Sequence, residues 1–417
     1  MRCATLATVF LVAVATTAAC TQQRSSTASI RLTATPARAL YDTPVTIRIT
    51  GLKPAQRVTV RTTTTDERGV TWSSSADFAA DQTGAVTNGQ PSIGGSYTGV
   101  NPMGLFETQT PPPSGSDQQT YFALPDDWRM HVTIQAGATT LASGELSRLY
   151  PSQVGVSERQ QRPSTAGIYG SVFLPADTAS RKPAVVVFGG AEGGVGTIGD
   201  AGLLAAHGYP ALALAYFAEP GLPTELRRIP LEYFASALRI LSQQPGVDPQ
   251  RMVVWGSSRG SEAAMLAGGY YPELVHAVIA SVPSASANGG LPDARQPAWT
   301  RAGVAVAVGS LIPVEKINGP VLLVCGGRDE VWPSCTSTEG IRDELAAANA
   351  ALPTVLQYPV AGHLVGNLLP FVPSVVTREA TASGAFLDAG GSPAADAAGR
   401  ADGWPKLLAF LAAVPRS

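Results

Sequence analysis

The stretch VVWGSSRGSEAA, residues 253–264, decides the fold. Three apolar residues run directly into Gly256, and a helix-forming run begins just after Gly260. A strand that turns into a helix through this G-x-S-x-G pattern is typical of a nucleophile elbow, which leaves its central serine, here Ser258, exposed at the edge of a sheet. The alternative is an ordinary turn, in which the glycines give clearance and the serines cap the helix. Ser257 is the second candidate for the nucleophile.

The elbow lies in a half of the chain, residues 151–417, in which apolar strands alternate with helices. Apolar runs without polar alternation are typical of buried parallel strands, and their alternation with helices predicts a doubly wound α/β sheet. With the elbow, the pattern predicts an α/β-hydrolase domain. Residues 284–320 delay one strand, and one interpretation is a cap over the active site. Strands are expected at 183–190, 210–217, 251–256, 275–282, 320–327 and 354–360, and helices at 202–209, 231–244, 261–269, 338–351 and 403–414.

The preceding region, residues 29–150, has an all-β pattern. Apolar and polar residues alternate within short segments, and turns rich in Gly, Pro or Asp separate them. Such spacing predicts an immunoglobulin-like β-sandwich domain. The clearest strands are expected at 29–35, 44–50, 57–65 and 130–136.

The composition of the 417-residue chain limits its partners. It is 45% hydrophobic but only 14% charged, and its net charge is −2. Typical domains are roughly a quarter charged. Because the chain has no basic excess, nucleic acid is excluded as an expected partner, and a small-molecule substrate is favoured.

The N-terminus predicts export. Arg2 precedes an apolar run, residues 4–15, and small residues lead to Cys20, so residues 1–20 are predicted to be a signal peptide. The stretch TTAAC resembles a bacterial lipobox, in which the cysteine is lipidated and anchors the mature protein to a membrane. Residues 21–28 would then be a tether, and the protein would lie in the cell envelope. The alternative is a plain signal peptide that is cleaved nearby.

A serine hydroxyl is a weak nucleophile and needs a neighbouring base. The chain has four histidines, and three have structural explanations. His131 belongs to the β-rich half, His207 ends a predicted helix, and His276 opens a strand at the opposite edge of the sheet from the elbow. His363 follows the last predicted strand, where a base can reach Ser258, so we identify it as the base. The alternative is a histidine of a surface loop.

An acid must orient the imidazole and stabilise its protonated form. Asp329 follows the strand at 320–327, in the turn that two glycines open. Glu330 is the alternative, but we expect it to face outward. The chain order Ser258, Asp329, His363 is the order of α/β-hydrolases.

The oxyanion hole is expected to use the backbone N–H of Arg259 and one donor from the loop after the strand at 183–190. Gly190 and Ala191 are the candidates in that loop. The same loop lacks the Lys-Ser/Thr of a P-loop and the spacing of a dinucleotide fingerprint. No cofactor and no metal are therefore expected.

Cys325 and Cys335 flank the segment that carries Asp329. In an exported protein such a pair is a candidate disulfide. The alternative is two free thiols, since a bridge requires Cα atoms within about 7 Å of each other.

The chain resembles the acyl-CoA thioester hydrolase/bile acid-CoA:amino acid N-acyltransferase family. The resemblance covers nearly all of the mature chain, and its motifs fall in family order. In the first half they are TGLKPAQRVTVRTTTTDERGVTWSSSADFAAD (50–81), GSY (95–97) and NPMGLF (101–106), and in the second VVVFGGAEGG (185–194), LAYF (214–217), LEYFASALRIL (231–241), GSSRGSE (256–262), GGRDEVWPS (326–334) and AGH (361–363).

The resemblance implies a β-sandwich followed by a hydrolase domain with Ser258, Asp329 and His363 as catalytic residues. It also implies hydrolysis rather than acyl transfer, because the acyltransferase branch is associated with a cysteine nucleophile. Acyl-CoA is not expected outside the cytoplasm, so the reaction type carries over more safely than the substrate. We therefore expect a serine-dependent acyl ester or thioester hydrolase. The alternatives are an acyltransferase that uses an acceptor other than water and a non-catalytic binding protein on a hydrolase fold.

Overall fold

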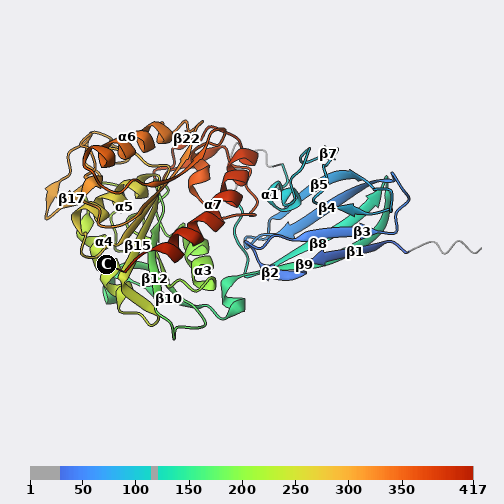
Figure 1. Ribbon diagram of the computed structural model, residues 1–417, viewed down its shortest axis with the longest axis horizontal. Helices are drawn as coiled ribbons and strands as arrows, with labels where there is room; N and C mark the ends of the chain where they lie inside the picture. The colour runs from blue at the N-terminus through green and yellow to red at the C-terminus, as the bar shows by residue number, and fades with distance from the viewer. Residues whose placement is uncertain (1–28, 114–120, 417) are drawn as a thin grey trace, which may run out of the picture.

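The computed structural model describes residues 29–113 and 121–416. The predicted signal peptide, the predicted tether and Cys20 lie outside these residues. Figure 1 shows two parts side by side, a β-rich part in blue and blue-green and an α/β part in green to red. The predicted fold class is confirmed in both parts.

The β-rich part consists of two sheets. One runs in the order β2-β9-β8-β4-β5-β7 and the other in the order β1-β3-β6. The long strands alternate buried and exposed residues, so each sheet has one face in the core. The strands are β1 (Arg31–Thr35), β2 (Arg38–Leu40), β3 (Thr46–Thr50), β4 (Arg57–Thr65), β5 (Thr71–Ala79), β6 (Val86–Thr87), β7 (Gly94–Gly95), β8 (Asp127–Ala136) and β9 (Thr139–Leu149), with the short helix α1 (Gly104–Glu107) between β7 and β8.

The α/β part is built on one mixed sheet in the order β10-β11-β13-β12-β15-β16-β19-β20. From β13 to β20 the neighbouring strands are parallel, and β10 and β11 pair antiparallel at one edge. All six strands predicted for this part are present. The strands are β10 (Ser157–Gln161), β11 (Tyr169–Leu174), β12 (Lys182–Phe188), β13 (Ala211–Ala215), β15 (Val247–Ser257), β16 (Ala277–Ser281), β19 (Val321–Gly326) and β20 (Thr354–Tyr358).

Helices cover both faces of this sheet, and the strand sequences explain why. Val185 and Val187 of β12 pack into one core, whereas the intervening Ala184 and Val186 pack into another. The first core includes residues of α3 and α7, and the second includes residues of α4, α5 and α6. Because both faces are buried, the strands have no polar side. The helices are α2 (Pro163–Ala166), α3 (Ile198–Ala206), α4 (Leu231–Ser242), α5 (Arg259–Tyr270), α6 (Ser334–Ala347) and α7 (Pro393–Ala413).

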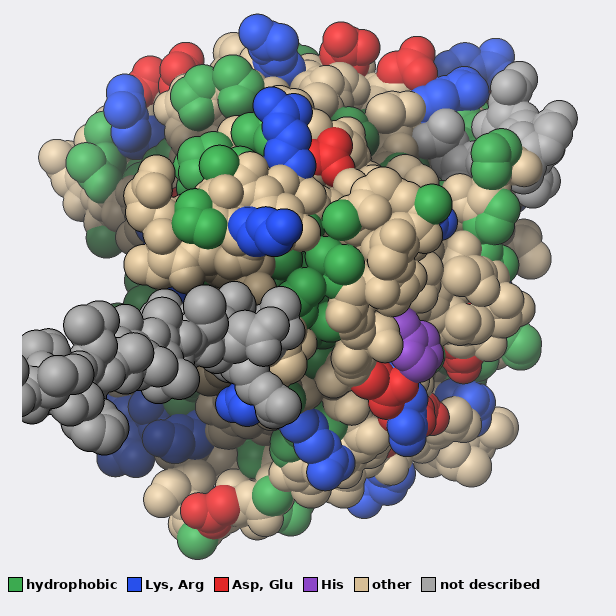
Figure 2. Space-filling view, turned by 90° about the vertical axis from the view of Figure 1, so that its right-hand side faces the viewer, with side chains coloured by type: hydrophobic (Ala, Val, Ile, Leu, Met, Phe, Trp, Pro, Cys, Tyr) green, Lys and Arg blue, Asp and Glu red, His purple; other side chains and the backbone are tan. Residues whose placement is uncertain are grey.

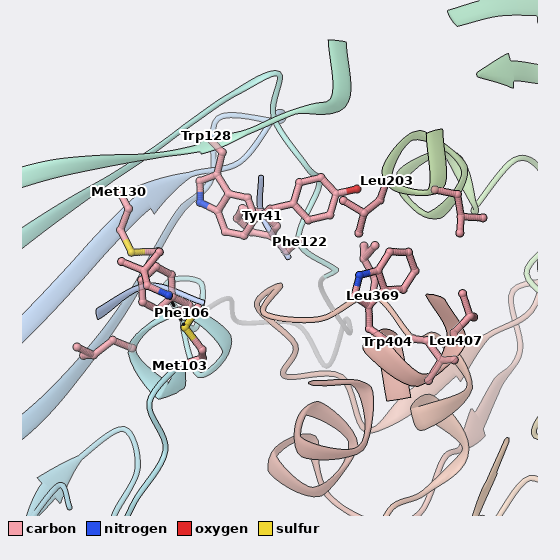
Figure 3. Close-up of a cluster of buried hydrophobic side chains, with 14 of the residues drawn as sticks. Tyr41, Met103, Phe106, Phe122, Trp128, Met130, Leu203, Leu369, Trp404 and Leu407 are labelled. Carbon is pink, nitrogen blue, oxygen red and sulfur yellow. Dashed lines mark hydrogen bonds between the residues drawn. The ribbon is translucent and has the colours of Figure 1, made fainter. Parts of the chain in front are cut away.

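The first of these cores continues into the β-sandwich, so the two parts share one hydrophobic cluster. Figure 3 shows Tyr41, Phe122 and Trp128 of the sandwich facing side chains of α3 and α7. Two polar contacts cross the same boundary. The Tyr41 hydroxyl donates to the carbonyl oxygen of Gly199 at 2.7 Å, and the Trp404 indole Nε1 donates to Asp42 at 2.9 Å.

On the face that Figure 2 shows, acidic, basic and hydrophobic side chains are interspersed. No helix within residues 29–113 and 121–416 is both long and apolar enough to cross a membrane.

Candidate active site

Ser258 lies in a strained turn between β15 and α5. Its φ is 55° and its ψ is −121°, a conformation that L-residues rarely adopt. The flanking glycines make the turn possible. A Cβ at Gly256 would lie 2.0 Å from the carbonyl oxygen of Gly260, and a Cβ at Gly260 would lie 2.3 Å from that of Gly189. The turn is therefore an elbow that brings α5 very close to the sheet, as the G-x-S-x-G pattern predicts.

The structure brings the three residues predicted for catalysis into one hydrogen-bonded chain. His363, at the start of a 3₁₀ turn after β20, has its Nε2 at 2.8 Å from Ser258 Oγ. Its Nδ1 lies 2.8 Å from Asp329 Oδ2 and 3.0 Å from Oδ1. All three side chains are buried or nearly so. Their roles in a reaction remain a prediction.

The loop after β19 fixes the acid and the imidazole. Asp329 Oδ1 accepts hydrogen bonds from the backbone N–H groups of Val331 at 3.0 Å and Trp332 at 3.3 Å. The Trp332 ring meets the His363 ring edge-on, with 5.2 Å between the centroids. Glu330 is exposed, as expected. The geometry thus brings Asp329, and not Glu330, to His363.

Cys325 and Cys335 form a disulfide in this structure, with Cα atoms 5.0 Å apart. Cys325 lies at the end of β19 and Cys335 in the first turn of α6. The bridge closes the loop that carries Asp329.

The candidate oxyanion donors lie beside the serine, but the N–H of Gly190 already donates to a carboxylate. A Cβ at Gly190 would lie 2.8 Å from Ser258 Cβ, so this loop contacts the elbow directly. The Gly190 N–H donates to both carboxylate oxygens of Glu192, at 2.9 Å each. Arg259 is the first residue of α5, so its N–H has no acceptor within the helix. Ala191 is buried in the same loop as Gly190, and its assignment as a donor stays a prediction.

The sequence reasoning missed two acidic residues beside the imidazole. Glu379, on β21 (Arg378–Ala380), has its Oε2 at 3.1 Å from His363 Nε2, the atom that also contacts Ser258. Glu192 lies in the loop proposed for the oxyanion hole. Its carboxylate, two residues after Gly190, could have indicated that it lies close to the active site. Glu379 belongs to an aperiodic stretch that carries no motif, so no comparable signal existed for it.

These carboxylates control the charge of the site. Burial by itself lowers the pKa of His363, but Glu379 and Asp329 outweigh burial and raise the pKa to about 10. Burial, together with the negative charge of Glu379, raises the pKa of Glu192 to about 7. At neutral pH these carboxylates therefore favour the protonated form of the imidazole.

A cavity of about 780 Å³ opens beside His363, Gly190 and Ser257. The sandwich contributes residues 121–124 to its wall, and the segment after β20 contributes others between 364 and 380. Residues 284–320, which we interpreted as a cap, do not line this cavity. They carry β17 (Trp299–Arg301) and β18 (Val304–Ala305), and Arg259 donates from its guanidinium to the carbonyl of Gly289, which ties them to α5.

The other three histidines lie away from the serine. His131 lies exposed on β8, and His207, at the end of α3, pairs with Asp42 at 2.5 Å. His276 accepts a hydrogen bond at Nδ1 from the N–H of Met252. The structural explanations given for them therefore hold.

The fold and the elbow define an α/β-hydrolase with a β-sandwich in front of it. A serine hydroxyl that is hydrogen-bonded to an imidazole, itself hydrogen-bonded to a carboxylate, can attack a carbonyl carbon. Comparison with family models is more specific. The model of the "Acyl-CoA thioester hydrolase/BAAT N-terminal region" matches residues 42–160, and that of the "BAAT / Acyl-CoA thioester hydrolase C terminal" matches residues 229–296 and 294–414. The chain belongs to this acyl-CoA thioester hydrolase/BAAT family.

Relatives match along most of their own lengths. Acyl-coenzyme A amino acid N-acyltransferase 1 of Mus musculus is 28% identical over 412 residues, covering 92% of this chain and 97% of that protein. Acyl-coenzyme A thioesterase 6 of Homo sapiens is 28% identical over 405 residues, covering 90% and 94%. Peroxisomal succinyl-coenzyme A thioesterase of Mus musculus is 27% identical over 409 residues, covering 90% and 94%. The names of these relatives thus include both thioesterases and an N-acyltransferase.

Among solved structures, a putative dienelactone hydrolase from Klebsiella pneumoniae is similar, with a TM-score of 0.45 and 18% identity. The match covers 62% of this chain and 99% of that one.

Proposed function

We propose that this protein hydrolyses acyl esters or thioesters through an acyl-enzyme on Ser258. His363 takes the proton from Ser258 Oγ as that atom attacks the carbonyl carbon, and then gives the proton to the leaving oxygen or sulfur. A water molecule then attacks the acyl carbon with His363 again as base. The bond from this carbon to Ser258 Oγ breaks, the free acid leaves, and His363 returns the proton to Oγ, while Asp329 orients the imidazole throughout. The N–H groups of Arg259 and of Ala191, or of Gly190 once Glu192 releases it, hold the oxyanion.

The observation that carries this proposal is the chain of hydrogen bonds from Ser258 through His363 to Asp329. His363 lies within 3.0 Å of both Ser258 and Asp329, which come from two other strand ends, and the serine has the strained backbone of an elbow. The names of the relatives support acyl thioesters as a substrate class and hydrolysis as the reaction.

Acyl transfer to an acceptor other than water is the second candidate, because a relative is named as an N-acyltransferase. The serine at position 258 favours hydrolysis over this alternative. Product analysis with candidate acceptors present separates the two reactions.

The test of the main proposal is a panel of acyl esters and thioesters assayed with the purified protein and with Ser258→Ala. We expect release of free acid from at least one ester or thioester, and its loss in the variant. Turnover that survives in Ser258→Ala would contradict the proposal.

We also propose that the protein is exported and anchored in the cell envelope through a lipid on Cys20. The support is the sequence of residues 1–20. The Cys20→Ala variant should leave the membrane fraction, and unchanged fractionation would rule the anchor out.

A further inference from the structure

A cluster of polar and aromatic side chains surrounds the first turn of α5, and the proposed reaction does not use it. Its members are Tyr216, Arg259, Glu262, Asn288 and Trp299, all of them buried except Asn288, which is partly buried. Arg259 Nε lies 3.0 Å from Glu262 Oε1, and Arg259 Nη2 donates to Glu262 Oε2 at 3.3 Å. This ion pair joins two side chains of α5 at the point where the helix leaves the elbow.

Both charged groups of the pair are fixed to the segment that contains Asn288 and Trp299. Trp299 Nε1 donates to Glu262 Oε2 at 2.9 Å. Asn288 donates its backbone N–H to Oε2 at 3.1 Å and its side-chain amide to Oε1 at 2.8 Å. The guanidinium of Arg259 donates to the carbonyl oxygens of Gly289 at 2.7 Å and of Asn288 at 3.1 Å. Arg259 therefore cannot shift without breaking several hydrogen bonds.

The cluster continues to the loop that supplies the other oxyanion donor. The Tyr216 ring packs against the Trp299 ring, with 5.8 Å between the centroids. The Tyr216 hydroxyl, just after β13, donates to the carbonyl oxygens of Gly189 and Gly190, each at 3.0 Å. One chain of contacts thus joins Arg259 to the loop that carries Gly190 and Ala191.

The cluster does not contact the substrate cavity. None of Tyr216, Glu262, Asn288 and Trp299 lines the cavity beside His363. Figure 1 shows β17, which carries Trp299, at the end of the α/β part that lies away from the β-sandwich, whereas the sandwich contributes to the cavity wall. Any effect of these side chains on catalysis must therefore pass through the backbone that they hold.

Stability is a weak explanation for such a cluster. A buried ion pair often contributes no more than apolar side chains of the same volume, because removing the charges from water is costly. An oxyanion hole, in contrast, has a demanding geometry, since its donors must lie about 2.7–3.1 Å from the developing charge, with a tolerance of about 0.5 Å. The Arg259 N–H also follows a strained residue, Ser258, and such a backbone persists only where surrounding contacts impose it.

We propose that Glu262 and Tyr216 are positioning residues of the oxyanion hole. Glu262 fixes Arg259 and, with it, the backbone N–H that receives the oxyanion. Tyr216 fixes the loop that carries the second donor, and the Trp299 ring between them keeps the two donors at a set distance from each other. The inference rests on the proposed hydrolytic function and adds to it two residues that act through the backbone.

The test measures kcat and KM of Tyr216→Phe and Glu262→Gln. The substrate is p-nitrophenyl butyrate, or the member of the ester and thioester panel that the unmodified protein hydrolyses fastest. Tyr216→Phe removes only a hydroxyl, and Glu262→Gln removes the charge but keeps the shape. Because loss of one oxyanion donor costs about 10²–10³ in kcat, we expect a displaced donor to lower kcat by about tenfold or more in each variant. KM should stay within about twofold, because no contact with the substrate is lost.

Inhibition by propylboronic acid gives a readout that a merely structural role would not change. Its boron accepts an electron pair from Ser258 Oγ, and His363 takes the hydroxyl proton. The anionic tetrahedral adduct resembles the intermediate of butyryl transfer, so it needs the same donors. The inhibition constant should therefore rise in each variant by about the factor by which kcat falls.

Tyr233→Phe and Asp248→Asn are the matched controls. The Tyr233 hydroxyl donates to the carbonyl oxygen of Ala215 at 2.7 Å, and Asp248 is a buried carboxylate in an ion pair with Arg251 at 2.9 Å. Neither residue lines the cavity, and Asp248 lies at the opposite end of β15 from the elbow. Both controls should keep kcat and the inhibition constant near the values of the unmodified protein, whatever Tm they lose.

A fall in Tm of Tyr216→Phe and Glu262→Gln without a change in kcat or in the inhibition constant would overturn the inference. Controls that lose activity equally would also overturn it. If Glu262→Gln does not fold, Tyr216→Phe decides by the same criteria. Full activity of both variants would refute the positioning role alone, whereas failure of the unmodified protein to hydrolyse any ester or thioester would refute the proposed function.

Discussion

At the scale of single residues, the protonation of His363 governs the chemistry. Carboxylates face its ring from three directions, namely Asp329 at Nδ1, Glu379 at Nε2 and Glu192 across the oxyanion loop. Asp396 of α7 adds a fourth negative charge nearby, and it accepts the N–H of Gly362. The imidazole thus has one partner that orients it and others that hold it charged.

Asp329→Asn should lower kcat by about 10⁴-fold with the fold retained, because an amide stabilises the wrong tautomer of His363. Steady-state kinetics and circular dichroism check this together. The matched control is Glu330→Gln, which changes an exposed neighbour and should remain near the unmodified rate. If the control variant is the inactive one, the acid is misassigned.

Glu379→Gln should shift the pH dependence of kcat/KM for a neutral ester. Only the neutral imidazole accepts the Ser258 proton, so activity rises as the pH passes through the pKa of His363. Glu379 is among the causes that raise this pKa to about 10, so its neutralisation should move the acidic limb to lower pH. A limb that stays in place, or moves to higher pH, would contradict the role assigned to Glu379.

At the scale of elements, the sequence was informative where periodicity and glycine spacing constrain the chain. The buried strands of the α/β sheet and the turns after β15, β19 and β20 follow from such signals, and these turns carry Ser258, Asp329 and His363. Glu379 could not be predicted, because its strand is three residues long and, among the described residues, pairs with β22 (Phe386–Asp388) alone, which no pattern marks. Residues 284–320 do not line the cavity beside His363, and insertion length alone could not tell which wall of a site this segment forms.

The disulfide between β19 and α6 should matter more to catalysis than to stability. It joins cysteines ten positions apart in the sequence, which corresponds to about 2–3 kcal/mol of stabilisation. The loop between these cysteines holds Asp329 against His363. Reduction should therefore cause a large fall in kcat and only a small fall in Tm. Assays with and without reductant, with non-reduced peptide mapping by mass spectrometry, check this. If the activity is the same with and without reductant, the bridge has a structural role only.

At the scale of the whole molecule, the β-sandwich is part of the active cavity. Residues 121–124 form part of the cavity wall, and the hydrophobic cluster of Figure 3 joins the sandwich to α3 and α7. Asp42 anchors this junction, because its Oδ2 accepts from Trp404 Nε1 and contacts His207 Nε2.

Asp42→Ala should lower the free energy of unfolding by about 1–3 kcal/mol, because the buried Trp404 N–H loses its acceptor. Urea denaturation measures the loss. Asp343→Ala, at an exposed position on α6, is the control and should stay within about 0.5 kcal/mol of the unmodified protein. Equal effects of the two substitutions would show that Asp42 does not stabilise the junction.

The most direct test of the central claim is labelling with a fluorophosphonate probe, read by peptide mass spectrometry. Such a probe bonds to a serine only where a base and an oxyanion site activate it. The account predicts one adduct, on Ser258, that forms in the unmodified protein and in Ser257→Ala but not in Ser258→Ala. An adduct on Ser257, or labelling that persists in Ser258→Ala, would contradict the assignment of Ser258 as the nucleophile.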